Sequence, residues 1–144
     1  MYQEKLLHKA LEYYGLNELP GPAENNPVIL QFFKEIGHQW VKNDETAWCS
    51  AFINYIATKC GYESSGKLNA RSWLTVGWQV ETPKPGDVVI LWREARTSWK
   101  GHVGLFIRQD QDLVYILGGN QSNQVNIKPY RKSRVLEYRR LKSL

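Results

Sequence analysis

Apolar residues in the first sixty positions recur three and four residues apart, which is the spacing of an amphipathic helix. Residues 6–14 fit one helix that stops at Gly15. Asn26 followed by Pro27 predicts an N-cap for a second helix, which ends at Gly37. The positions expected to face the core are Leu6, Leu7, Ala10, Leu11, Tyr14, Ile29, Leu30, Phe33 and Ile36.

A third helix is expected to begin at Asp44 or Thr46, either of which can cap it, and to end near Gly61. Its apolar face is wide enough for a buried helix and consists of Trp48, Phe52, Ile53, Tyr55 and Ile56. A shorter helical piece is expected over "NARSWLTVG", residues 69–77.

The pattern changes to short apolar runs after the turn at Pro85-Gly86. Strands are expected at "VVILW", "HVGLFIRQ", "LVYILGG", "QVNI" and "RVLEYRRL", and "DQD" joins the second and third of them as a hairpin. Helices followed by strands indicate an α+β fold with N-terminal helices packed on an antiparallel sheet of about five to six strands. At 144 residues, we expect a single domain over 1–144.

The charge balance narrows the choice of partners. The net charge is +5, which favours an anionic partner such as a nucleic acid, a membrane surface or a wall polymer. Much of the excess positive charge lies in "KPYRKSRVLEYRRLKSL". Apolar residues interrupt the cations there, as in a half-buried strand, so no nucleic-acid partner is expected. No apolar run is long enough for a membrane span, and the N-terminus does not resemble a signal peptide.

Cys49 is the candidate nucleophile. A thiol in the first helical turn lies where the helix dipole favours thiolate, and its own backbone N–H could donate to an oxyanion. Taken alone, this cysteine fits a buried structural role at least as well. Cys60 should lie roughly 16 Å away along the same helix, too far for a disulfide, and we read it as structural. No metal or cofactor is expected, because two cysteines without nearby histidines do not make a zinc site.

A thiol nucleophile needs a proton acceptor, and His102 is placed for it. His102 opens the strand "HVGLFIRQ" after a glycine, whereas His8 and His38 are expected at the surface or as caps. Asn120, at the end of the next strand, is expected to orient the imidazole. Gln121 beside it and Asp87 at the Pro-Gly turn are the alternatives, although Asp87 fits a turn cap better.

Together these motifs resemble the papain-like cell-wall hydrolases of the NlpC and CHAP type. The resemblance runs over about residues 5 to 140 and is carried by "DETAWCSAF", "ARSWL", "PKPGDVVILWR", "GHVGLFI", "LGGNQSNQV" and "VLEYRR". It implies Cys49 as nucleophile, His102 as general base and acid, and a polar third residue that maps best onto Asn120. It also implies cleavage of an amide bond in peptidoglycan, by a stem-peptide endopeptidase or an N-acetylmuramoyl-L-alanine amidase.

The chain departs from the family pattern at two places. Gly118 stands where CHAP enzymes often have a glutamate, and the loop "REARTSWK" is longer and more charged than the usual turn. Trp48, Arg71, Trp73 and Gln121 are the candidates to line the substrate groove, and packing in the core is the competing explanation for each tryptophan.

Two classes of function follow from these residues. The first is a monomeric cysteine amidohydrolase that acts in the periplasm or cell wall after phage lysis or a dedicated secretion system has delivered it. A secreted effector would bring a cognate inhibitor protein as a further partner. The alternative is an inactive or non-catalytic basic module that binds the cell wall.

Overall fold

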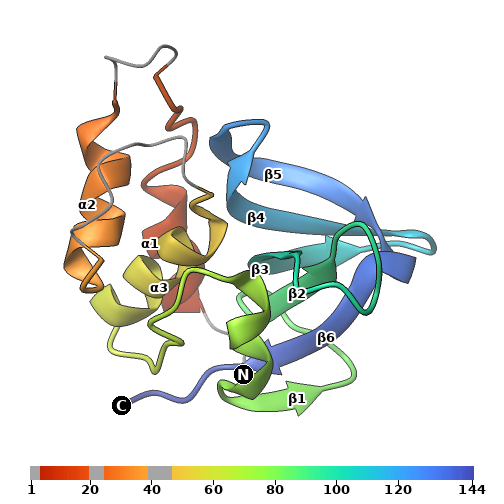
Figure 1. Cartoon of the computed structure of the whole chain (residues 1–144). Helices are drawn as coiled ribbons and strands as arrows, with labels where there is room; N and C mark the ends of the chain where they lie inside the picture. The colour runs from red at the N-terminus through yellow and green to blue at the C-terminus, as the bar shows by residue number, and fades with distance from the viewer. Residues whose placement is uncertain (1–3, 20–24, 39–46) are drawn as a thin grey trace.

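The computed structural model describes residues 4–19, 25–38 and 47–144. Three helices, α1 (Glu4–Leu11), α2 (Pro27–Glu35) and α3 (Cys49–Lys59), lie on one side of a six-stranded sheet (Figure 1). The short 3-10 helix η1 (Ala70–Thr75) follows α3, as "NARSWLTVG" predicted, and a second one, η2 (Lys132–Arg134), precedes the last strand. The prediction that the third helix begins at Asp44 or Thr46 is wrong, because α3 begins at Cys49 with Trp48 at its N-cap. Asp44 and Thr46 themselves lie outside the described residues.

The helix ends follow their sequence signals closely. The Asn26 side chain accepts a hydrogen bond from the Val28 N–H at 2.9 Å, so the predicted cap of α2 is confirmed. The prediction that Leu11 and Tyr14 face the core is wrong, because α1 ends at Leu11 and both side chains are exposed. In α2, Phe32 is buried together with Ile29 and Phe33. Within the described residues, none of the helices combines the length and apolar character needed to cross a membrane.

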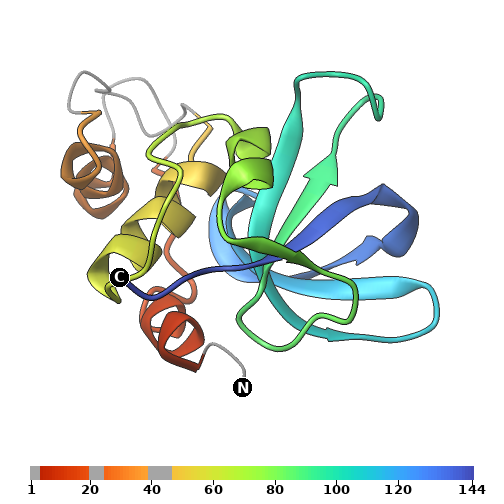
Figure 2. The ribbon, with the colours of Figure 1, turned by 90° about the horizontal axis from the view of Figure 1, so that it is seen from below.

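The sheet is antiparallel throughout its paired strands and has the order β1-β6-β2-β3-β4-β5. Its strands are β1 (Trp78–Val80), β2 (Val88–Trp92), β3 (Gly101–Gln109), β4 (Leu113–Gln121), β5 (Gln124–Arg131) and β6 (Val135–Arg140). The hairpin through "DQD" is confirmed, while β1 was missed because three residues carry too little pattern. A view from below shows how strongly the sheet curves (Figure 2).

The curved sheet buries apolar side chains on both faces. Residues that alternate along β2 and β3, such as Val88, Ile90 and Val103, join the helices in one core. Their neighbours Leu91 and Phe106 pack in a second cluster on the opposite face. The continuous run "VVILW" is therefore apolar because both faces of β2 are covered.

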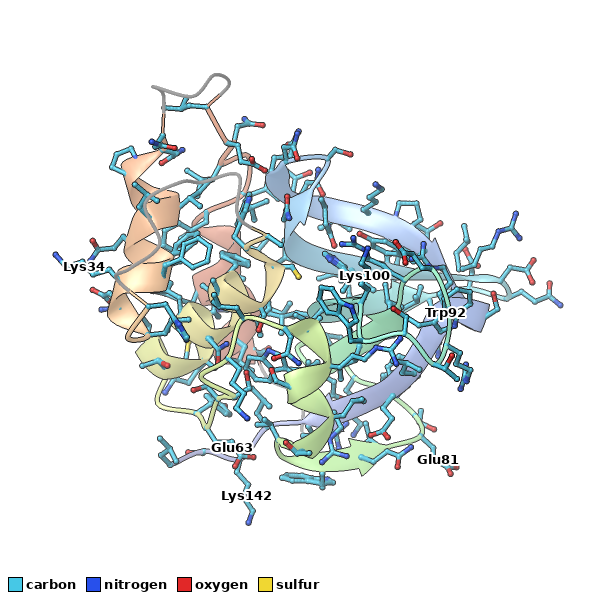
Figure 3. All side chains as sticks on the ribbon, in the orientation of Figure 1. Lys34, Glu63, Glu81, Trp92, Lys100 and Lys142 are labelled. Carbon is cyan, nitrogen blue, oxygen red and sulfur yellow. The ribbon has the colours of Figure 1, made fainter. Side chains whose placement is uncertain are left out.

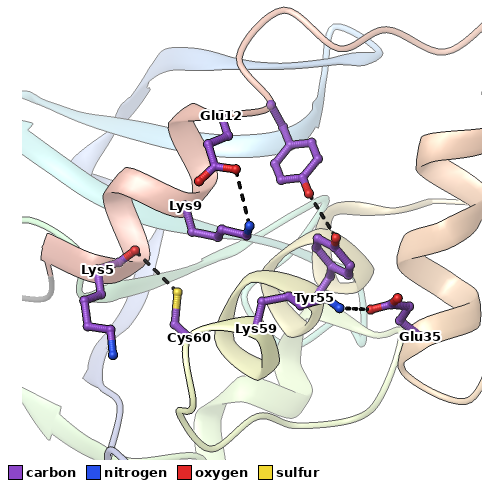
Figure 4. A network of polar contacts seen from close by, with 8 residues as sticks. Lys5, Lys9, Glu12, Glu35, Tyr55, Lys59 and Cys60 are labelled. Carbon is purple, nitrogen blue, oxygen red and sulfur yellow. Dashed lines mark hydrogen bonds and ion pairs between the residues drawn. The ribbon is translucent and has the colours of Figure 1, made fainter.

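Polar contacts join α3 to α2, to α1 and to the segment that follows α1 (Figure 4). Tyr13 and Tyr55 share a hydrogen bond of 2.9 Å, and Lys59 of α3 forms an ion pair of 2.7 Å with Glu35 of α2. The Cys60 thiol donates to the Lys5 carbonyl at 3.4 Å, and both cysteines are free, as expected. These contacts fix α3, and with it the position of its first residue.

Candidate active site

Cys49 is the first residue of α3 and is 6% exposed. At this end of the helix, the Phe52 N–H donates to the Trp48 carbonyl at 2.9 Å. The N–H of Cys49 therefore belongs to the first turn, whose donors have no carbonyl partner within the helix. The structure thus places the thiol at a helix N-terminus, which is the position that the sequence predicted.

The surroundings of the thiol act on its pKa in opposite directions. Burial raises the pKa of the Cys49 thiol, while the backbone N–H groups of Val103 and Ser50 and the charge of Arg93 lower it. Burial dominates, so the thiol is protonated at neutral pH. Val103 directly follows His102 along β3, so the thiol lies next to the stretch of backbone that carries the imidazole.

His102 is the second residue of β3 and is 7% exposed. It pairs with Leu91 of β2, and its ring lies 5.4 Å from that of Tyr130, measured between centroids. Burial lowers the pKa of His102 from 6.5 to about 4. The hydrogen bond that the ring donates to Gln121 acts against this shift, and the charges of Arg93, Lys128 and Arg134 add to it. The resting pair is therefore a neutral thiol and a neutral imidazole.

Gln121 holds the imidazole in one tautomer. Its Oε1 lies 2.9 Å from His102 Nε2. Its Nε2 donates to the Ile116 carbonyl at 3.1 Å, the Asn126 carbonyl at 2.8 Å and Asn126 Oδ1 at 2.9 Å. Because the amide nitrogen faces only acceptors, Oε1 must face His102, and Nε2 of the ring must carry the proton. The lone pair is then on Nδ1, which is the ring atom that can accept a proton.

The expected orienting residue, Asn120, does not make this contact, because a β-bulge shifts the register by one residue. Gly118 pairs with Asn126 and Gln121 pairs with Gln124, so three steps along β4 face two along β5. Asn120 is the extra residue and has a left-handed backbone with φ 57°. Gln121 thereby takes the place that Asn120 would occupy in a regular strand. Two glycines followed by asparagine were a usable signal for this bulge.

Two glycines allow the close packing around this contact. A Cβ on Gly118 would lie 2.7 Å from Gln121 Oε1 and 3.5 Å from His102 Nε2. A Cβ on Gly119 would lie 2.7 Å from the Trp48 ring. The glutamate that the family pattern would place near Gly118 has no room here, because the Gln121 side chain fills that space.

The tryptophans expected in the groove lie in the core instead. Trp48 and Trp73 are both 0% exposed and cannot reach a substrate. The Trp48 indole N–H donates to Glu18 at 3.1 Å, and that of Trp73 donates to Ser50 Oγ at 2.9 Å. The competing explanation, packing of the helix face, holds for both residues.

Arg71 and Asp87 also have structural partners. The Arg71 guanidinium donates to the carbonyls of Lys100, Arg96 and Ala95 at 2.9, 2.8 and 3.0 Å, so it clamps the loop between β2 and β3. Asp87 accepts from the Lys84 N–H at 2.8 Å, as a turn cap does. Its carboxylate also holds the Arg140 guanidinium at 2.9 and 2.7 Å, and therefore it does not orient His102.

A small pocket of about 110 Å³ opens beside Cys49, and the sequence did not predict it. Its lining residues come from the start of α3, the segment before η1 and the loop between β2 and β3: Ala47, Cys49, Leu68, Ala70, Arg93, Trp99, Lys100 and Gly101. Trp92 and Lys100 mark the two ends of that loop in Figure 3. A larger hollow of about 440 Å³ includes Lys67 and Asn69 among its lining residues, so the segment 67–70 separates the two.

Comparisons with known proteins agree with this geometry. Residues 40–120 match the CHAP domain family. Among solved structures, the chain is similar to a lipoprotein-like protein of the NLP/P60 family from Staphylococcus aureus subsp. aureus Mu50, with 17% identity and a TM-score of 0.54. The match covers 94% of this chain and 40% of that protein, so the chain spans less than half of its length. A search of curated proteins found no match. The predicted resemblance and the α+β architecture are both confirmed.

Proposed function

The chain belongs to the CHAP domain family, whose members are typically cysteine-dependent amidohydrolases, and from this premise we propose that it hydrolyses an amide bond of peptidoglycan. The observation that carries the proposal is the hydrogen bond of 2.9 Å between Gln121 and His102, together with a thiol at a helix N-terminus that contacts the backbone N–H of Val103, the residue after His102. A purely structural cysteine needs no oriented imidazole at its side. Peptidoglycan as substrate places the action at the cell wall.

The first half of the reaction forms a thioester. His102 Nδ1 takes the proton of the Cys49 thiol as the sulfur attacks the carbonyl carbon, because the resting pair is neutral. The negative charge moves to the carbonyl oxygen, where the N–H of Cys49 can donate to it. The carbon–nitrogen bond then breaks, and the imidazolium gives its proton to the leaving amine.

The second half restores the enzyme. Water loses a proton to His102 Nδ1 and attacks the thioester carbon, the carbon–sulfur bond breaks, and the sulfur regains its proton from the imidazolium. Gln121 Oε1 keeps its hydrogen bond to Nε2 through both halves, so the ring holds its orientation while Nδ1 gains and loses the proton.

The test uses both cysteines. Purified wild type, Cys49→Ala and Cys60→Ala proteins are incubated with peptidoglycan, and the released fragments are identified by mass spectrometry. We expect wild type and Cys60→Ala to release the same fragments and Cys49→Ala to release none, and the new termini identify the bond. Equal release by Cys49→Ala would rule out the cysteine mechanism. No release by any of the proteins, with retained binding to the wall, would favour a binding module.

A further inference from the structure

The loop between β2 and β3 carries three cations, Arg93, Arg96 and Lys100. In "REARTSWK", Lys100 Nζ forms an ion pair of 2.7 Å with Glu94 and lies 5.8 Å from the centre of the Trp99 ring. No hydrogen bond or ion pair joins the Arg93 guanidinium to any part of the chain that the structure describes. Arg93 also lines the pocket beside Cys49, which Arg96 does not, so among the described residues it is the pocket's unpaired cation.

Arg93 lies close enough to the candidate catalytic residues for its charge to act on them. Arg93 lines the small pocket together with Cys49, and its charge acts on both Cys49 and His102. The other lining residues are small or apolar, apart from Lys100, and Trp99 stands 74% exposed at the edge. A ligand in this pocket thus meets the Arg93 guanidinium, which no described residue pairs, above an apolar floor.

Arg71 gives the loop a fixed shape. Its three hydrogen bonds hold the carbonyls of Ala95, Arg96 and Lys100, so the loop is tied to η1 between its two ends. A guanidinium on a loop held in this way is preorganised for a planar anion, and a carboxylate is the group that matches its fork of donors. Binding then costs little ordering of the loop.

We propose that Arg93 and Trp99 form a subsite beside Cys49 that binds a carboxylate of the wall peptide close to the scissile amide bond. Arg93 pairs with the carboxylate, and Trp99 covers the aliphatic part of the same residue. The inference rests on the proposed function for its substrate. It adds that the enzyme prefers peptides with a free carboxylate over those in which that group is an amide.

Two synthetic peptides test this preference. Both are L-Ala–γ-D-Glu–L-Lys–D-Ala, and one carries a carboxamide in place of the α-carboxylate of D-Glu. Binding is measured by calorimetry with Cys49→Ala, which cannot form the thioester, and with Cys49→Ala carrying Arg93→Gln. Cys49→Ala with Arg96→Gln is the matched control, because it removes the same charge from the same loop outside the pocket.

We expect Cys49→Ala to bind the carboxylate peptide about tenfold more tightly than the amide, the effect of one charge-assisted hydrogen bond. Arg93→Gln should abolish this preference, and Arg96→Gln should keep it. Equal affinity of Cys49→Ala for the two peptides, or a preference that survives Arg93→Gln, would overturn the inference. Because binding is measured without turnover, this result is separate from the release of fragments that tests the proposed function.

Discussion

The orienting contact of the candidate site depends on the single residue Gln121. Asn126 holds its amide so that only Oε1 can face His102. The neighbouring Asn120 differs from it in having a left-handed backbone and no role in that hydrogen bond. The two adjacent amide residues can therefore be separated by mutation.

Gln121→Ala should lower kcat by about 100-fold, because the imidazole loses the acceptor that fixes its tautomer. Asn120→Gly is the matched control, since glycine keeps the left-handed backbone while the side chain is removed. It should leave kcat within about threefold of wild type. The measurement is the rate of fragment release from peptidoglycan at saturating substrate. A large loss for Asn120→Gly with little loss for Gln121→Ala would contradict the assignment.

The pKa values at this site predict an unusual pH dependence. His102, with a pKa of about 4, stays neutral above that pH and can accept a proton where an ordinary imidazole of pKa 6.5 is protonated. We therefore expect kcat/KM at pH 5 to remain within about twofold of its value at pH 7. A fall centred near pH 6.5 would contradict the buried, neutral imidazole.

The thiol gives an independent measurement of the same resting state. Since burial raises the pKa of Cys49, alkylation by iodoacetamide should be slow at pH 7 and should rise only above the ordinary range of thiols. The measurement uses Cys60→Ala protein, so that Cys49 is the one thiol followed. Fast alkylation at neutral pH would indicate a preformed thiolate.

At the scale of elements, the loop between β2 and β3 is the segment that Arg71 controls. Arg71→Lys keeps the charge but cannot reproduce three hydrogen bonds to separate carbonyls. We expect KM to rise about tenfold with a smaller change in kcat, because the loop lines the pocket but does not carry the reacting groups. Amides 94–100 should also exchange hydrogen faster.

Arg108→Lys is the control for this change. Arg108 lies at the far end of β3, with its guanidinium 3.8 Å from the centre of the Tyr115 ring, and it holds no carbonyl of the pocket loop. Its substitution should leave KM and the exchange of residues 94–100 unchanged. The same rise in KM for both variants would mean that the effect of Arg71 is general rather than due to the clamp.

The elements were more predictable than the contacts between them. Apolar spacing located α2, α3 and η1, the Asn26-Pro27 signal located the start of α2, and turn residues located the hairpin of β3 and β4, because these features are local in sequence. Cys49 and His102 could be found because each stands at the start of an element. The two glycines before Asn120 indicate a bulge, but which residue then contacts His102 depends on strand pairing, and the pocket at Arg93 depends on loop packing. Neither can be derived from one sequence.

The sequence also could not predict which aromatic residues are buried. Trp48 and Trp73 were candidates for the groove as well as for the core, and their spacing fits both. Only the packed structure shows that Gly119 approaches the Trp48 ring and that Ser50 accepts from Trp73. For an aromatic residue near a nucleophile, its burial is therefore needed to decide whether it binds substrate or packs in the core.

At the scale of the whole molecule, one buried ion pair joins β6, near the end of the chain, to the turn before β2. Asp87 is 0% exposed, and Arg140 binds both of its oxygens, at 2.9 and 2.7 Å. Asp87→Asn should lower the free energy of unfolding by about 3 kcal/mol, because the Arg140 charge loses its partner inside the protein. Thermal unfolding should then move down by about 10 °C.

The activity of the Asp87→Asn protein shows whether the Asp87–Arg140 ion pair has only a structural role. Below its unfolding transition, Asp87→Asn should turn over substrate at the wild-type rate per folded molecule, since Gln121 and not Asp87 contacts His102. Glu137→Gln is the control: its partner is Arg139 at 2.9 Å, both side chains are partly exposed, and we expect a loss below about 1 kcal/mol. If the folded Asp87→Asn protein had a strongly reduced kcat, Asp87 would have a role in the reaction as well as in stability.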